Sequence, residues 1–246
     1  MPSEFVVVNV KRQKKTQAKS YWEEFNIPYR PYMNVITLLQ EIQKNPRTFD
    51  SRKTTPIVWE QSCLEEICGS CTMVINGRVR QACSTLVDKI GSQVTLEPMT
   101  KYPVIRDLVV SRKSLFENFK RVKAWVPPVE ETGPGPKISS ELAQMRYEMS
   151  KCMACGCCIE ACPQVNERSE FIGAAPINQV RLFNTHPIGA QLKSERLFTL
   201  MQKGGIEECG NAQNCVKVCP KGIPLVTSII GTNRDITLNL LNIIKK

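Results

Sequence analysis

The chain has 246 residues, of which 42% are apolar and 23% charged, a composition typical of folded globular proteins rather than disordered ones. No stretch approaches the ~20 apolar residues of a membrane-spanning helix, and the N-terminus, Met1–Phe5, lacks the basic and apolar regions of a secretory signal. We therefore expect a reducing compartment, in which the 12 cysteines are more often metal ligands than disulfides. The formal net charge of +10 is compatible with nucleic acid, an acidic partner or an anionic membrane surface.

The first half of the chain predicts a mixed α/β domain. Phe5–Val10 is a β-branched run, and the segment 35–42 repeats apolar residues at helical spacing behind a possible N-cap at Asn34. Residues 72–75 and 78–80 flank Asn76-Gly77, the strongest short signal for a β-hairpin. The basic run 11–15 is interpreted as a solvated turn after the first strand. Because no aromatic residues interleave with it, we expect no nucleic-acid partner.

A linker is predicted at residues 127–137, because six of the ten residues 127–136 are Pro or Gly. It separates domains at 1–126 and 138–246, both of ordinary size. The second domain is expected to be mostly α-helical. Pro176 can open a helix that runs through Phe183, and Ser194 can cap a second helix over 195–201 that ends at Gly204.

The first cysteine group has the spacing of plant-type [2Fe–2S] ligands, Cys-x4-Cys-x2-Cys followed by a fourth cysteine, in Cys63, Cys68, Cys71 and Cys83. Two irons need four thiolates, and Gly69 and Ser70 are small enough for backbone N–H groups to approach the cluster. The alternative is a four-cysteine zinc knuckle. It usually has two Cys-x2-Cys arms, and the second arm is missing here.

Two further runs match a bacterial two-cluster ferredoxin. The first run, Cys-x2-Cys-x2-Cys-x3-Cys-Pro, is complete in Cys152, Cys155, Cys158, Cys162 and Pro163. The second run has the same spacing but has Ala212 in place of the second cysteine. Its remaining motif residues are Cys209, Cys215, Cys219 and Pro220. In such ferredoxins the fourth cysteine of a run binds the other cluster.

If the fourth cysteine of each run is assigned to the cluster of the other run, these cysteines divide into two sets. One set is complete and predicts a [4Fe–4S] cluster on Cys152, Cys155, Cys158 and Cys219. The other has only three thiolates, Cys162, Cys209 and Cys215. A cubane that lacks one thiolate readily lacks the corresponding iron, so this set predicts [3Fe–4S].

Two residues stay outside these sets. Cys157 is either an alternative ligand in a slipped register or, as we favour, a buried thiol beside the cluster. His186, which precedes Pro187, is either a ligand or proton carrier or, as we favour, a surface or packing residue.

Three clusters of different type suggest a path for single electrons. The sequence has neither Gly-x-Gly-x-x-Gly after a strand nor a phosphate-binding Gly-Lys-Ser/Thr, so we expect no nucleotide or flavin site and no catalytic residue in this chain. Substrate chemistry is therefore expected on a partner.

The cluster order and the motifs around residues 63–77, 152–163 and 214–222 resemble the iron–sulfur subunit of succinate dehydrogenase and fumarate reductase over nearly the whole chain. The resemblance implies an α+β protein, with a plant-ferredoxin-like β-grasp domain before a mostly helical bacterial-ferredoxin-like domain. It also implies a flavoprotein partner with covalent FAD that oxidises succinate or reduces fumarate. A membrane anchor, often a cytochrome b with haem, would hold the chain at the cytoplasmic face of the cell membrane, with quinone near the [3Fe–4S] cluster.

The chain departs from ubiquinone-linked members of this family. Those commonly have tryptophan shortly after the Cys-Pro at 162–163 and histidine just after the cysteine at 209, where this chain has Gln164-Val165-Asn166 and Gly210. Residues 171–173 and 175–184 instead resemble the menaquinone-linked type with a single di-haem anchor. Quinone contacts are therefore not carried over, and the cluster ligands do not indicate the direction of electron flow.

Two other classes are alternatives. A stand-alone multi-cluster electron carrier would favour an acidic surface, and the charge of +10 argues mildly against it. The cluster subunit of a heterodisulfide-reductase-like or glycolate-oxidase-like complex usually lacks the plant-type cluster, so residues 63–83 count against it.

Overall fold

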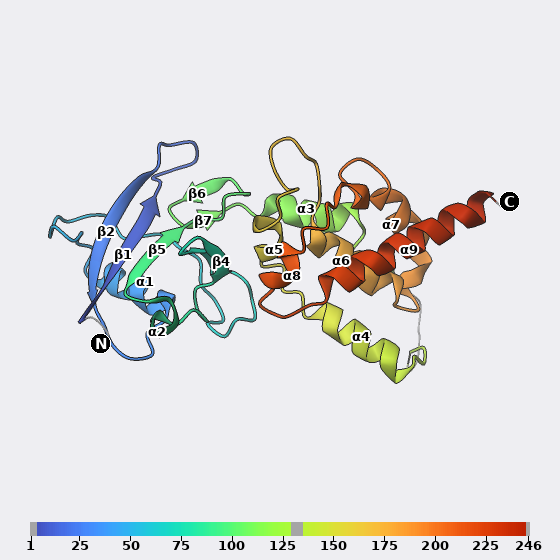
Figure 1. Cartoon of the computed structure of the whole chain (residues 1–246), viewed down its shortest axis with the longest axis horizontal. Coiled ribbons are helices and arrows are strands. Elements are labelled where there is room, and N and C mark those ends of the chain that lie inside the picture. The colour runs from blue at the N-terminus through green and yellow to red at the C-terminus, as the bar shows by residue number, and fades with distance from the viewer. Residues whose placement is uncertain (1–3, 129–134, 245–246) are drawn as a thin grey trace. The chain divides into compact units, whose positions relative to one another are not determined.

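The structure is a computed structural model that describes residues 4–128 and 135–244 (Figure 1). It divides into two compact units, residues 1–112 and 113–246, and each is described by itself. Within the described ranges, no helix is both long and apolar enough to cross a membrane.

The first unit is built on a five-stranded mixed sheet with the strand order β2-β1-β5-β3-β4. Only β1 and β5 pair in parallel, and the other neighbours are antiparallel. The strands are β1 (Phe5–Arg12), β2 (Tyr21–Pro28), β3 (Thr72–Ile75), β4 (Arg78–Gln81) and β5 (Gln93–Glu97). The unit also contains the helices α1 (Val35–Lys44) and α2 (Val87–Ile90) and the small hairpin of β6 (Val104–Arg106) and β7 (Val109–Val110).

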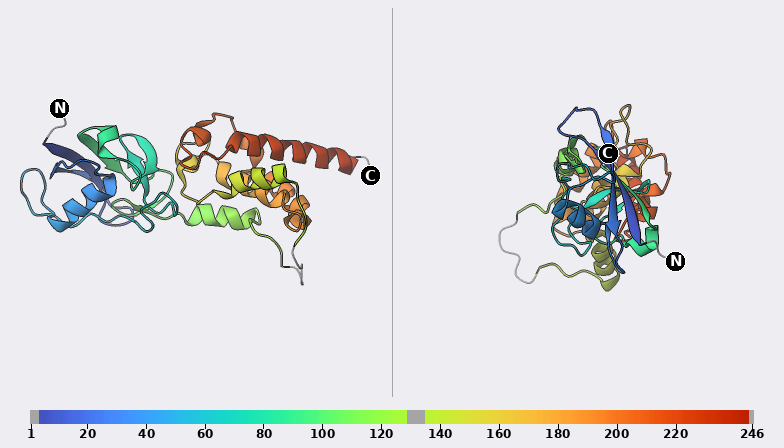
Figure 2. Two further views of the ribbon diagram at one scale, coloured as in Figure 1. Left: turned by 90° about the horizontal axis from the view of Figure 1, so that it is seen from below. Right: turned by 90° about the vertical axis from the view of Figure 1, so that its left-hand side faces the viewer.

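One helix and the sheet share the core of this unit. Alternate residues of β1 are buried, as the pleat of a strand requires, and they pack with Leu38, Leu39 and Ile42 of α1. Helix α1 lies against one face of the sheet (Figure 2). Asn34 caps α1 by accepting the Thr37 backbone N–H at 2.9 Å, so the predicted cap is confirmed. The predicted hairpin is confirmed too, since β3 and β4 pair around Asn76-Gly77.

The basic run after the first strand differs from its predicted role. Lys14 and Lys15 are exposed, but Arg12 still belongs to β1 and is 1% exposed. Its guanidinium bonds Asp107 through two nitrogens at 2.9 and 3.1 Å and also pairs with Glu23. Burial lowers the pKa of Arg12, but its bond to Asp107 and the two carboxylate charges outweigh burial, so the pKa is raised. The interpretation of Arg12 as part of a solvated turn was wrong.

The second unit is helical. Its elements are α3 (Lys113–Arg121), α4 (Ser140–Ser150), α5 (Cys157–Glu160), α6 (Ala174–Asn184), the 3₁₀ turn Gly189–Leu192, α7 (Lys193–Leu200), the 3₁₀ turn Ile206–Glu208, α8 (Asn214–Lys217) and α9 (Leu225–Ile244). Helices α6 and α9 pack side by side (Figure 1). The fully buried Asn178 of α6 donates to the Met149 carbonyl at 3.0 Å and accepts from Ser228 at 2.8 Å, which ties α4 and α9 to α6. The sheet-rich first unit and the helical second unit confirm the predicted α+β fold class.

Residues 113–126, predicted to end the first domain, lie with the second unit. Val122 is fully buried in the helical core, and the guanidinium of the fully buried Arg196 donates to the carbonyls of Lys123 and Trp125 at 2.9 and 2.8 Å. The predicted linker at 127–137 falls partly outside the described residues, and its role between two domains stays a prediction.

One helix start was predicted wrongly. The 3₁₀ turn Gly189–Leu192 runs directly into α7, so Ser194 lies inside the first turn and does not cap it. Pro176 was placed correctly, because it lies in the first turn of α6, where a missing N–H costs no hydrogen bond.

Candidate metal centres

The first cysteine group lies in a loop bent around its sulfur atoms. Cys71 directly precedes β3, and Cys83 follows β4 after one residue, so the hairpin fixes the spacing of these two buried thiols. The loop 63–69 turns through left-handed conformations at Leu64, Glu66 and Gly69. As a result, several of its backbone N–H groups point at sulfur.

These N–H groups give the loop the chemistry of a thiolate site. The N–H groups of Ile67 and Cys68 each lie 3.3 Å from the Cys63 sulfur, and the N–H of Glu66 lies 3.4 Å from the Cys83 sulfur. Donors in this arrangement stabilise negative charge on sulfur, which is what iron ligation places there. The residues present therefore fit the predicted [2Fe–2S] group.

The thiols of this loop differ in acidity. Burial raises the pKa of Cys71 to about 12. Burial also raises the pKa of Cys68, but hydrogen bonds from Ser70 and from backbone N–H groups outweigh it and lower this pKa to about 6. Burial therefore opposes the thiolate form that ligation requires at Cys71, whereas the hydrogen-bond donors of the loop favour that form at Cys68.

The two ferredoxin-like runs share a pattern of backbone conformations. In the first run the residues on either side of Cys155, Ala154 and Gly156, have φ of 51° and 89°. In the second run the residues on either side of Ala212, Asn211 and Gln213, have φ of 52° and 58°. A short helix follows each pair, α5 in the first run and α8 in the second. Ala212 therefore occupies the same kind of slot as Cys155.

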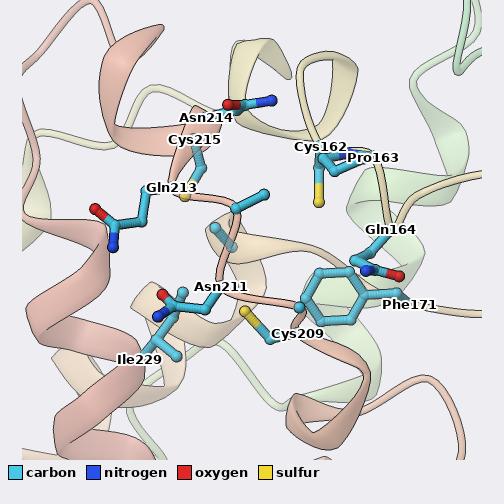
Figure 3. A pocket seen from close by; sticks show the side chains of 13 residues that line it. Cys162, Pro163, Gln164, Phe171, Cys209, Asn211, Gln213, Asn214, Cys215 and Ile229 are labelled. Carbon is cyan, nitrogen blue, oxygen red and sulfur yellow. The ribbon is translucent and has the colours of Figure 1, made fainter.

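The structure gathers the thiols of these runs around two cavities. One cavity, partly open to solvent, is lined by Cys162, Cys209 and Cys215 (Figure 3) and also by Ala212. The other is lined by Cys152, Cys155, Cys158 and Cys219, and also by Cys157. Each run contributes to both cavities, and the division of thiols is the one that crossed ligation requires. The ligand sets themselves stay predictions.

Burial disfavours ionisation of three thiols that line these cavities. Burial raises the pKa of Cys158 well above its ordinary value, and it also raises the pKa of Cys152 and Cys215. A bound group must therefore supply positive charge, as iron does, to hold them as thiolates. Among the described residues, no three Cys, His, Asp or Glu side chains could hold a single metal ion. A cubane-type cluster spaces its thiolates more widely, because each binds a different iron.

Two residues were left open by the sequence. Cys157 is fully buried and lines the same cavity as Cys152, Cys155, Cys158 and Cys219, in agreement with a thiol beside the cluster, although its role stays a prediction. His186 packs on its own turn, since its Nδ1 accepts the backbone N–H groups of Ile188 and Gly189 at 3.1 Å each. Burial and, to a smaller extent, the charge of Arg146 lower its pKa. These bonds favour the packing interpretation.

Sequence reasoning missed two polar residues at these centres. Asn214 precedes Cys215 in the second run as Cys157 precedes Cys158 in the first. Its side chain donates to the Ala161 carbonyl at 3.1 Å and so joins the two runs beside the three-thiol cavity, the one lined by Cys162, Cys209 and Cys215. Gln81 lies beside Cys71 with its amide oxygen 3.5 Å from the sulfur. No spacing rule marks either residue, because each contact depends on how the chain folds back.

Comparison with known families agrees with this geometry. Residues 7–117 match the family described as a 2Fe-2S iron-sulfur cluster binding domain, and residues 148–223 match the 4Fe-4S dicluster domain. The fold is similar to that of a chain in the Mycobacterium smegmatis Sdh1 complex in the apo form. That chain gives a TM-score of 0.81 at 21% identity, over 96% of this chain and 97% of the other.

Curated relatives cover almost the full length. The chain is 53% identical to the succinate dehydrogenase iron-sulfur subunit of Bacillus subtilis (strain 168), over 93% of this chain and 91% of the relative. It is 32% identical to the fumarate reductase iron-sulfur subunit of Wolinella succinogenes, over 88% and 90%. The thiol-lined loop, the two shared cavities and these similarities show that the chain belongs to the family of succinate dehydrogenase and fumarate reductase iron–sulfur subunits, which transfer electrons within oxidoreductase complexes.

Proposed function

We propose that this chain is the iron–sulfur subunit of a succinate:quinone oxidoreductase and connects a flavoprotein, where FAD reacts with succinate or fumarate, to a membrane quinone. When bound, its clusters supply one-electron carriers. The proposed ligands are Cys63, Cys68, Cys71 and Cys83 for [2Fe–2S], Cys152, Cys155, Cys158 and Cys219 for [4Fe–4S], and Cys162, Cys209 and Cys215 for [3Fe–4S]. The observation that carries this proposal is the way the seven proposed ligand thiols of the two runs divide between two cavities, each lined by both runs.

The proposed partners are an FAD-containing flavoprotein and a cytochrome b anchor with haem b. The anchor would hold the chain at the cytoplasmic face of the cell membrane, with quinone, of the menaquinone type, near the three-thiol cavity. Gln164 and Gly210 line that cavity, and a side chain at position 210 would displace the flexible end of the Gln164 side chain. This packing supports a quinone environment that differs from one built on tryptophan and histidine.

Fumarate reduction with electrons from quinol is the second candidate, because the Wolinella relative is a fumarate reductase subunit. The higher identity to a succinate dehydrogenase subunit supports succinate oxidation as the first. Redox titration of every centre in the purified complex, beside turnover measured in both directions, tests the choice. A complex that transfers electrons in neither direction would contradict both candidates.

The metal content tests the cluster assignment. Purified anaerobically in its complex, the chain should contain about nine iron atoms, the total of the three proposed clusters, and essentially no zinc. Elemental analysis with visible absorption measures this. One or two zinc atoms without iron–sulfur absorption would contradict the proposal.

Crosslinking tests the orientation. A photo-crosslinker at the exposed Lys217, in the helix that carries Cys215, should capture the anchor, because the three-thiol cavity is proposed to lie nearest the quinone. The same group at the exposed Glu65, in the loop of Cys63, should capture the flavoprotein and serves as the matched control. Capture of the anchor from position 65 instead would reverse the proposed order.

A further inference from the structure

A buried carboxamide lies beside one proposed ligand of the [2Fe–2S] group. Gln81 is the last residue of β4, is 1% exposed, and faces Thr72 across the hairpin. Its Oε1 lies 3.5 Å from the Cys71 sulfur, and its Nε2 donates to the Thr72 hydroxyl at 2.8 Å. The amide therefore touches the ligand sulfur on one side and a hydroxyl on the other.

The hydroxyl belongs to a short chain of hydrogen bonds that ends on the cysteine loop. Thr72 donates to the Gly69 carbonyl at 2.7 Å, and the Arg112 guanidinium donates to the same carbonyl at 2.9 Å. Arg112 is held in turn by Glu60 at 3.0 Å. Because Gly69 has two donors, the Thr72 hydroxyl can turn to another acceptor without leaving a buried carbonyl unpaired.

The orientation of the amide depends on the state of Cys71. As a thiol, Cys71 donates its S–H to the Gln81 oxygen. A cysteine that binds iron has lost this hydrogen, so its sulfur can only accept, and an amide oxygen beside it would be an unfavourable contact between two buried acceptors. A half-turn of the amide brings Nε2 to the sulfur and Oε1 to the Thr72 hydroxyl. The two ends of the amide are nearly the same size, so no repacking is needed.

We propose that in the cluster-loaded protein Gln81 donates its side-chain N–H to the Cys71 sulfur and thereby raises the reduction potential of the [2Fe–2S] centre. Hydrogen bonds to a ligand sulfur stabilise the reduced cluster, which carries one more negative charge. Gln81 is thus a positioning residue that acts through Cys71. The inference rests on the proposed ligation by Cys71.

Substitution of Gln81 tests the sign of the effect. In the purified complex, Gln81→Leu should lower the equilibrium constant for one-electron reduction of the [2Fe–2S] centre about tenfold, which is ~59 mV. The other two centres, titrated in the same sample by electron paramagnetic resonance, should keep their potentials. If the amide oxygen faced the sulfur, the same substitution would raise the potential, and an unchanged potential would mean that Gln81 only packs. Either result overturns the proposal.

Two threonines provide a matched pair of variants. Thr72→Val removes the hydroxyl that holds the amide and should lower the potential in the same direction as Gln81→Leu. Thr85→Val is the control, because the similarly buried Thr85 donates to the backbone carbonyl of Gln81 at 2.7 Å rather than to its amide. It should leave the potential unchanged. Equal shifts in both variants would assign the effect to the backbone of β4 and overturn the proposal.

A measurement on the unaltered protein covers the case in which the variants lose the cluster. With glutamine labelled by ¹⁵N at the side-chain nitrogen, pulsed electron paramagnetic resonance of the reduced [2Fe–2S] centre should detect a coupled ¹⁵N nucleus. Absence of this coupling overturns the role of Gln81. Absence of any [2Fe–2S] signal in the unaltered complex would instead contradict the proposed function itself.

Discussion

Ala212→Cys is expected to convert the three-thiol centre into [4Fe–4S]. The new thiol would lie in the wall of the cavity that holds Cys162, Cys209 and Cys215. The backbone around position 212 already has the two left-handed residues that flank Cys155 in the complete run. The fourth thiolate therefore has a prepared slot, and no change of loop conformation is needed.

The added iron and thiolate should lower the potential of this centre. Cluster type and charge move potentials between about −700 and +450 mV, and even ~60 mV changes a one-electron equilibrium tenfold. Quinone reduction should fall strongly, while succinate oxidation with an artificial acceptor at the flavin persists.

Electron paramagnetic resonance of the oxidised complex gives the direct reading, because an oxidised [3Fe–4S] cluster is paramagnetic and an oxidised [4Fe–4S] cluster is silent. The signal should be present in the unaltered protein and lost in Ala212→Cys. Ala212→Ser, of similar size but without a thiolate, is the matched control and should keep the signal. An unaltered protein without this signal would show that the three-cysteine assignment is wrong.

Arg12→Met is expected to destabilise the first unit by about 3–5 kcal/mol, the usual cost of breaking a buried ion pair. Methionine keeps most of the length of the side chain but removes its charge. Asp107 is 1% exposed and the Glu23 side chain 8%, so both carboxylates would be left without their cation in a poorly solvated place. The temperature at which the [2Fe–2S] circular dichroism disappears should fall clearly.

Arg106→Met is the control for this variant. Arg106 directly precedes Asp107 but is exposed, so its loss should change the melting temperature little. Adding Asp107→Asn to Arg12→Met should recover part of the lost stability, because it removes one of the two stranded charges. Equal effects of Arg12→Met and Arg106→Met would show that the buried pair contributes nothing.

Local signals in the sequence were sufficient to predict the β3–β4 hairpin and the capped helix α1. Asn76-Gly77 sets the turn of the hairpin, and Asn34 with the apolar repeat behind it sets the start of α1. The cysteine frames could also be predicted, because cluster chemistry fixes which residue types bind iron and at what spacing.

Arg12 and Gln81 could not be predicted, because their partners come from distant parts of the chain or depend on strand register. Arg12 meets Asp107 across 95 positions of sequence. Gln81 meets Cys71 only because Thr72 and Gln81 face each other in the hairpin. The basic composition of residues 11–15 predicts exposure to solvent. Only the fold shows that Arg12 is buried.

Because each of the two cavities is walled by both cysteine runs, a group bound in either one closes the same loop of chain, which contains α6 and α7. With both proposed clusters bound, the two cysteine runs would be linked to each other twice at one place. Oxidative loss of a single cluster would leave the other still joining the runs, so the unit should resist proteolysis until both are gone. Damage would then accumulate as inactive but folded subunits before it produces unfolded ones.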